Sequence, residues 1–185
     1  MTRVGILGVG AVGARLARQL VSTDVDEVVI RDDSISRAEL VATSLGDAAI
    51  VDRGAMTDPL DADIVVLAGP GRVQAGQAAV FVRAGQHVVS TSDDIDDVRA
   101  LLSLDHEARE RGVHLVVGAG FAPGLTCVLA AHGATRFDRV DEIHVAKSGT
   151  GGPACARQHH RAVGRGALDW QPLSAYRHIA RRMGV

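Results

Sequence analysis

A glycine-rich turn near the start of the chain constrains the fold more than any other feature of the sequence. The short apolar segment Arg3–Leu7 leads directly into the motif Gly8–Gly13, which reads G-V-G-A-V-G. Apolar residues then recur at helical spacing over Ala11–Val21. A strand that turns through three spaced glycines into a helix is typical of the first βαβ unit of a dinucleotide-binding domain.

Each glycine of this turn has an expected role. Gly8 permits the tight turn, Gly10 lets the backbone approach a diphosphate, and Gly13 allows the helix to pack on the strand. The N–H groups at the helix start, with the positive end of the helix dipole, favour an anion there. We therefore predict that the cofactor is held by Gly8, Gly10, Ala11, Val12 and Gly13.

An acidic residue at the end of the next predicted strand is the second part of this motif. Asp32 lies 19 residues after Gly13, and Asp33 adds a second negative charge. A carboxylate there accepts hydrogen bonds from the ribose of NAD and repels the extra phosphate of NADP. Arg31 or Arg37 could instead reach a 2′-phosphate, so NAD is favoured and NADP stays open. A simple turn or helix-capping role for Asp32 is the alternative.

Strand and helix patterns alternate along most of the chain. Strands are predicted at 3–7, 27–31, 48–51, 63–68, 86–90 and 113–117, with helices at 11–21, 36–45, 73–83 and 95–111. Repeated βα units of this length favour parallel strands joined by right-handed crossovers. We predict a doubly wound α/β Rossmann domain over 1–120 and the start of a second, incomplete α/β domain over 121–185. That second part is expected to contain a helix at 125–134, a strand at 140–146 and a helix at 174–183.

A second glycine-containing loop follows the fourth predicted strand. Ligands of open α/β sheets bind at the carboxyl ends of the strands. Gly69 and Pro70 are therefore expected to lie beside the ribose and nicotinamide of the cofactor. A plain strand-terminating turn is the competing interpretation.

Three segments, 4–13, 88–94 and 118–126, make the chain resemble the saccharopine dehydrogenase-like family over roughly residues 3–150. The most specific of them reads Gly-Ala-Gly-Phe-Ala-Pro-Gly-Leu-Thr. The resemblance implies a Rossmann domain that continues into a mixed α/β substrate and dimerisation domain. It also implies NAD(P)-linked oxidation or reduction of a C–N bond in an amino acid or related amine, and a homodimer. Family members are longer, so the alternative expectation is a truncated, non-catalytic NAD(P)-binding module.

Few residues are candidates for proton transfer. Lys147 is the only lysine and ends a predicted strand, so we predict it as a catalytic acid or base, with a surface lysine as the alternative. The adjacent His159 and His160 are expected to be loop histidines, because neighbouring residues point in different directions and no metal site is predicted. His114 and His144 fall in strand patterns and are expected to be packed and hydrogen-bonded.

Composition and charge exclude several other classes. Hydrophobic residues make up 46% and charged residues 23%, enough to bury a core. No apolar run approaches a membrane span or forms a signal peptide, so a cytoplasmic protein is expected. Cys127 and Cys155 fit neither a disulfide framework nor a zinc cluster.

Arginines gather near the C-terminus, at Arg157, Arg161, Arg165, Arg177, Arg181 and Arg182. No series of aromatic residues accompanies them, so solvated arginines are expected in preference to a nucleic-acid surface. A basic-tailed interaction protein on a Rossmann scaffold is the third alternative.

Overall fold

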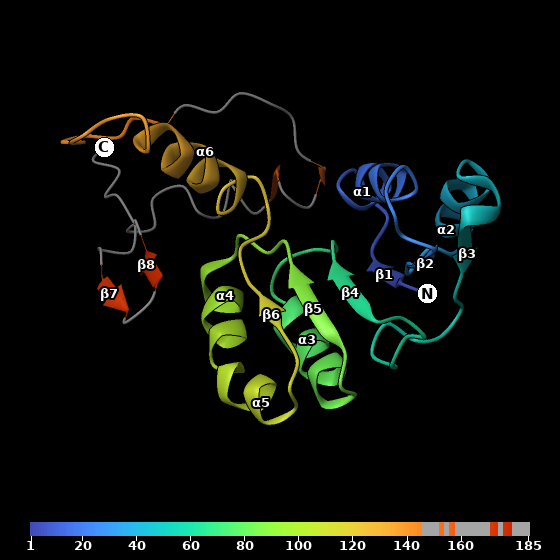
Figure 1. The fold of residues 1–185 in the computed structure, drawn as a ribbon. Helices are drawn as coiled ribbons and strands as arrows, with labels where there is room; N and C mark the ends of the chain where they lie inside the picture. The colour runs from blue at the N-terminus through green and yellow to red at the C-terminus, as the bar shows by residue number, and fades with distance from the viewer. Residues whose placement is uncertain (146–151, 154–155, 158–170, 174–175, 179–185) are drawn as a thin grey trace. The chain divides into compact units, whose positions relative to one another are not determined.

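A six-stranded parallel sheet forms the centre of the structure, a computed structural model that describes residues 1–145, 152–153, 156–157, 171–173 and 176–178 (Figure 1). The strands lie in the order β3-β2-β1-β4-β5-β6. Their bounds are β1 Arg3–Leu7, β2 Glu27–Arg31, β3 Ala49–Val51, β4 Ile64–Leu67, β5 His87–Ser90 and β6 Leu115–Val116. Every neighbouring pair is parallel, which confirms the predicted doubly wound α/β class.

Helices cover both faces of this sheet. They are α1 Gly13–Leu20, α2 Ile35–Thr43, α3 Gln74–Arg83, α4 Ile95–Leu102 and α5 Asp105–Glu110. Neighbouring residues of β1 face opposite sides, because side chains alternate along a strand. Ile6 belongs to an apolar cluster with Ala17 of α1 and Ala38 of α2. Leu7 belongs to a second cluster with Phe81 of α3. In Figure 1, α1 and α2 lie beside β1–β3, while α3, α4 and α5 lie beside β4–β6.

The strand register brings three loops to one edge of the sheet. Leu7, the last residue of β1, pairs with Arg31 on one side and with Leu67 on the other. The strand order reverses between β1 and β4, and crevices at such switch points bind ligands in open α/β sheets. Gly8, Asp32 and Ala68 therefore follow their strands side by side at this crevice.

The predicted helix at 95–111 is wrong as a single element, because the structure divides it into α4 and α5. The hydroxyl of Ser103 donates to the carbonyl oxygen of Ala100 at 2.7 Å, and the N–H of Leu104 donates to Leu101 three residues back. A hydroxyl that bonds to a nearby carbonyl competes with the helical pattern, and a tighter turn then ends the helix. The predicted strand at 48–51 is also shorter, since a 3₁₀ turn, η1 Gly46–Ala48, precedes β3.

Beyond the sheet, one of three predicted elements is confirmed. The helix at 125–134 forms α6, Leu125–Ala134. The predicted strand at 140–146 is wrong over its described residues, 140–145, which pair with no strand of the described chain. Their apolar members Val140, Ile143 and Val145 are exposed, so the burial on which a strand assignment depends is missing.

The predicted helix at 174–183 is contradicted where the structure describes it. An antiparallel pair forms instead, β7 Gln171–Leu173 with β8 Tyr176–His178, and Leu173 lies opposite Tyr176. The two paired segments are separated by only two residues, and helical spacing of apolar residues does not distinguish such local antiparallel pairing from a helix. Residues 174–175 and 179–183 lie outside the described residues.

The chain divides into two compact units, Met1–Gly152 and Pro153–Val185. The predicted boundary at residue 120 stays a prediction. Among the described residues, no helix has the length and apolar character needed to cross a membrane.

Candidate dinucleotide site

Two backbone hydrogen bonds join the loops at the switch point. The N–H of Gly8 donates to the carbonyl oxygen of Arg31 at 2.8 Å, and the N–H of Ala68 donates to that of Leu7 at 2.8 Å. The parallel ladder therefore continues one residue past the strands, and the start of each loop is held by the sheet.

Two glycines of the motif are required by internal packing. Gly8 has a φ of +89°, and a Cβ there would lie 2.8 Å from the backbone nitrogen of Gly69. A Cβ on Gly13 would lie 1.9 Å from the carbonyl oxygen of Gly8. These contacts match the roles predicted for Gly8 in the turn and for Gly13 in helix packing.

Gly10 differs, because a Cβ there would meet no atom within 4 Å. Gly10, Ala11 and Val12 are exposed, and within the described part of the chain their N–H groups have no hydrogen-bond partner. The N-cap residue of α1 is Val12, whose side chain makes no capping hydrogen bond. Unpaired donors at a helix start, with open space above Gly10, fit the diphosphate of a dinucleotide.

Asp32 is buried beside this turn, with 6% of its surface exposed. Its Oδ2 accepts a hydrogen bond from the N–H of Val9 at 2.7 Å. Its Oδ1 accepts from the N–H of Ser34 at 2.8 Å and from Arg37 Nη1 at 3.1 Å. The carboxylate therefore connects the glycine turn, the end of β2 and the first turn of α2.

The expectation that Arg31 could reach a 2′-phosphate is wrong. Arg31 is 2% exposed and cannot turn toward such a group. Its Nε donates to Asp52 Oδ1 at 2.7 Å. Its remaining donors bond to the carbonyl oxygens of Ala55, Asp58 and Pro59. A buried guanidinium with these partners stabilises the segment after β3, so Arg31 is a structural residue.

Buried polar side chains that the sequence did not single out support the loop after β4. Gln74 is 1% exposed, and its Nε2 donates to the carbonyl oxygen of Gly69 at 2.9 Å. Its Oε1 accepts from the hydroxyl of Ser90 at 2.8 Å. Gly69 is half-buried and Pro70 is exposed, at the edge where both were predicted.

Arg72, in the same loop, has a φ of 75°, which non-glycine residues rarely adopt. Its N–H donates to Asp97 Oδ2 at 3.1 Å, and its Nε donates to Asp94 Oδ2 at 3.0 Å. Asp97 Oδ1 also accepts from the N–H of Ala75 at 2.8 Å. These contacts join the starts of α3 and α4, and no local sequence signal predicted them.

The pKa of Asp94 reflects this setting. Burial alone would raise the pKa, but the Arg72 hydrogen bond and charge, with the N–H groups of Asp97 and Asp96, outweigh it. The net effect lowers the pKa of Asp94 below its usual value, so the carboxylate is stabilised in its charged form.

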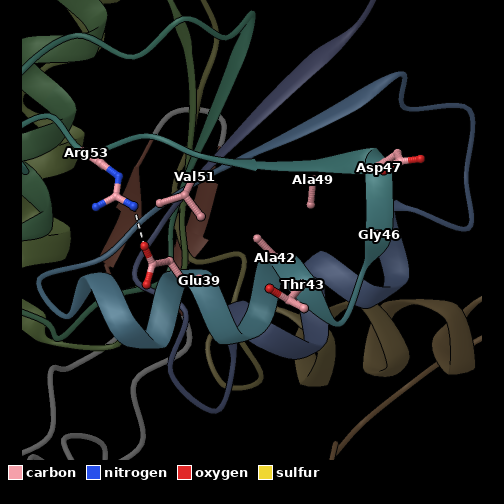
Figure 2. Close-up of a pocket in the computed structure, with 8 residues that line it drawn as sticks. All are labelled: Glu39, Ala42, Thr43, Gly46, Asp47, Ala49, Val51 and Arg53. Carbon is pink, nitrogen blue, oxygen red and sulfur yellow. Dashed lines mark hydrogen bonds and ion pairs between the residues drawn. The ribbon is translucent and has the colours of Figure 1, made fainter.

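A shallow pocket of about 480 Å³ lies elsewhere, between α2 and the edge strand β3 (Figure 2). An ion pair between Glu39 and Arg53 spans it. None of the predicted cofactor-binding residues lines this pocket, and the glycine turn has the better donors for an anion. We therefore place the candidate site at the switch point.

Lys147, His159, His160 and Cys155 lie outside the described residues.

The packed environment predicted for His114 and His144 is wrong. Both are exposed: His114 stacks on His87 at 5.2 Å, and His144 pairs with Glu142 at 2.9 Å. They lie just before β6 and in a segment without a strand, so the sheet does not enclose them. Cys127 is a free, exposed thiol. The described residues contain no group of three or more metal-ligating side chains.

Comparison with known proteins supports the same class of domain. Residues 3–94 match the family model described as "NADP oxidoreductase coenzyme F420-dependent". This region contains the glycine turn, Asp32 and the loop after β4.

Three solved structures are similar to this chain. Apo saccharopine dehydrogenase (L-Glu forming) from Saccharomyces cerevisiae is 22% identical with a TM-score of 0.62, and the match covers 74% of this chain and 31% of that one. GenD2 from gentamicin A biosynthesis, in complex with NAD, is 27% identical with a TM-score of 0.56, covering 72% and 38%. Biliverdin reductase from Synechocystis sp. PCC 6803, in complex with biliverdin and NADP+, is 24% identical with a TM-score of 0.57, covering 73% and 42%.

The fold, the glycine turn and these matches define an NAD(P)-binding Rossmann domain. The matched region spans 31% to 42% of the length of those three proteins.

Proposed function

We propose that this protein is an NAD(P)-dependent oxidoreductase that holds the diphosphate of its cofactor at the start of α1. The observation that carries the proposal is the contrast within one motif. Gly8 and Gly13 are required by backbone contacts, whereas Gly10 has open space and lies among N–H donors that have no partner in the described part of the chain. A glycine with no packing role, at a helix start, is explained by a ligand that approaches the backbone.

The neighbouring loops supply the remaining cofactor contacts in this proposal. Asp32 would receive the adenosine ribose, and the loop at Gly69 and Pro70 would lie beside the nicotinamide ribose. The bound cofactor would donate or accept the hydride, while the protein binds and orients it.

The substrate we propose is an amino acid or a related amine, oxidised or reduced at a C–N bond. Support for this class comes from the resemblance to the saccharopine dehydrogenase-like family and from the similarity of the fold to saccharopine dehydrogenase. Lys147 is the proposed acid or base because it is the only lysine of the chain. We also propose that the protein forms a homodimer and is located in the cytoplasm.

A non-catalytic NAD(P)-binding module is the second candidate. One observation favours it: the loops proposed to hold the cofactor lie within residues 8–70, inside the region 3–94 that the family model matches. Cofactor binding is common to both candidates, so turnover decides between them.

The test has two stages. Calorimetry should detect binding of NAD or NADP to the full chain, and Gly10→Val should abolish it while circular dichroism stays native. Absorbance of the reduced nicotinamide, followed across a panel of amino acids, then tests turnover. Binding without turnover would favour the module, and a wild-type protein that binds neither nucleotide would refute both candidates.

A further inference from the structure

We propose that Arg37 is the residue that sets the choice between NAD and NADP. Its guanidinium would bind the 2′-phosphate of NADP, and its ion pair with Asp32 would compete with the ribose of NAD. This inference rests on the proposed cofactor site and extends it to the adenosine end.

The first step concerns the hydrogen bonds that the Asp32 carboxylate already accepts. A carboxylate has about four acceptor positions. Three donors occupy three of these positions here: the N–H of Val9 on Oδ2, the N–H of Ser34 on Oδ1, and Arg37 on Oδ1 at 3.1 Å. Arg37 Nη1 also lies 3.5 Å from Oδ2. A ribose diol can therefore gain full access to Asp32 only when Arg37 moves away.

The second step is the position of Arg37 itself. Its side chain is 54% exposed, whereas that of Asp32 is 4% exposed. The two backbone donors to Asp32 belong to the glycine turn and to the loop before α2, so they are fixed. Arg37 is the exposed side-chain donor of the three, and its planar guanidinium suits a phosphate oxyanion.

The third step removes the other nearby candidates. Arg31 is buried against Asp52, and Arg53 pairs with Glu39 beside the pocket of Figure 2. Asp33 is exposed and adjacent to Asp32, and its negative charge opposes a phosphate. NADP binding would therefore depend strongly on Arg37.

Two hydroxyls, one at the N-cap of α2 and one in its first turn, are compatible with this assignment. The Oγ atoms of Ser34 and Ser36 lie 3.1 Å apart, and Ser36 is exposed. Hydroxyls donate to phosphate oxygens, so they would add contacts once Arg37 has turned to the ligand.

Arg37→Gln in the full chain tests the inference by shifting two affinities in opposite directions. The Kd for NADP should rise at least tenfold, because the phosphate loses its cation. The Kd for NAD should stay level or fall, because Asp32 is released to the ribose. Arg53→Gln is the matched control, since it removes an exposed arginine outside the site and should change neither Kd. Asp33→Asn should lower the Kd for NADP several-fold by removing the opposing charge.

The ratio of the two affinities is the informative measurement. A purely structural role for Arg37 would weaken both cofactors equally and leave the ratio unchanged, and that result overturns the inference. A wild-type protein that binds NAD but shows no measurable affinity for NADP also overturns it. Failure of the proposed function looks different, because the wild type would then bind neither nucleotide.

Discussion

The start of α1 differs from the starts of α3 and α4 in how its N–H groups are paired. At the β1–α1 turn, Gly10, Ala11 and Val12 expose N–H groups that have no partner among the described residues. At the start of α3 the chain supplies its own acceptor, because Asp97 accepts from Ala75. Asp94 likewise accepts from the N–H groups of Asp96 and Asp97 at the start of α4.

This difference indicates which helix start requires an anion from a ligand. Helix starts leave donors that require acceptors, and buried carboxylates accept from those at the starts of α3 and α4. The start of α1 leaves its donors without a partner among the described residues, and Gly10, which has no packing contacts, lies beside them. The start of α1 is therefore suited to bind an anion, whereas the carboxylates at α3 and α4 hold the crevice in shape.

The largest expected effect comes from comparing two glycines of the turn that opens α1. Gly13→Ala should destabilise the protein by about 3 kcal/mol, because its Cβ would overlap the carbonyl oxygen of Gly8 at 1.9 Å. Gly10→Ala should leave the free energy of unfolding nearly unchanged, because no atom lies within 4 Å of its Cβ, yet it should weaken cofactor binding. Urea unfolding and calorimetry measure the two quantities.

Equal loss of stability in both variants would contradict the division of roles among the glycines. So would a Gly10→Ala protein that is native in stability and unchanged in affinity for both cofactors, because the open space would then have no ligand.

The next effect concerns the carboxylate that accepts from N–H groups at the start of α3. Asp97→Ala should cost about 2 kcal/mol, because the N–H groups of Arg72 and Ala75 would lose their acceptor. Cofactor affinity should change little, since Asp97 is not in the binding turn. Asp96→Ala is the matched control on the same helix, and its exposed side chain should make it close to neutral. A large loss of cofactor affinity in a folded Asp97→Ala protein would contradict a purely structural role for this carboxylate.

The smallest effect is a dependence on pH. The pKa of Asp94 is lowered in the folded state, so its charge stabilises the fold above the usual carboxyl pKa, and this stabilisation is lost as the pH falls through the folded value. Asp94→Asn keeps a capping side chain and loses the charge. The variant should be less stable by about 1 kcal/mol or less at about pH 7, because Arg72 is half exposed.

That difference should shrink as the pH falls below about 4, and urea unfolding at several pH values measures it. A difference that is independent of pH would mean that the charge of Asp94 contributes nothing to stability.

Local patterns were sufficient for much of the fold and of the proposed site. The order of strands and helices from β1 to β6 follows from alternating apolar periodicity. The glycine turn depends on chain geometry within six residues, and Asp32 on its place at the end of a strand. The exposed segment 140–145 shows the limit, because an apolar pattern does not provide a partner strand.

The sequence by itself determined a parallel sheet, a glycine turn opening the first helix, and an acid after the second strand. Only the tertiary structure decided that Arg31 is buried against Asp52 and that Asp97 accepts hydrogen bonds at the start of α3. The physical reason is the separation in sequence between the residues that make each contact. Turns and helix starts depend on neighbouring residues, whereas these polar contacts depend on strand register and loop packing, which bring distant residues within hydrogen-bonding distance.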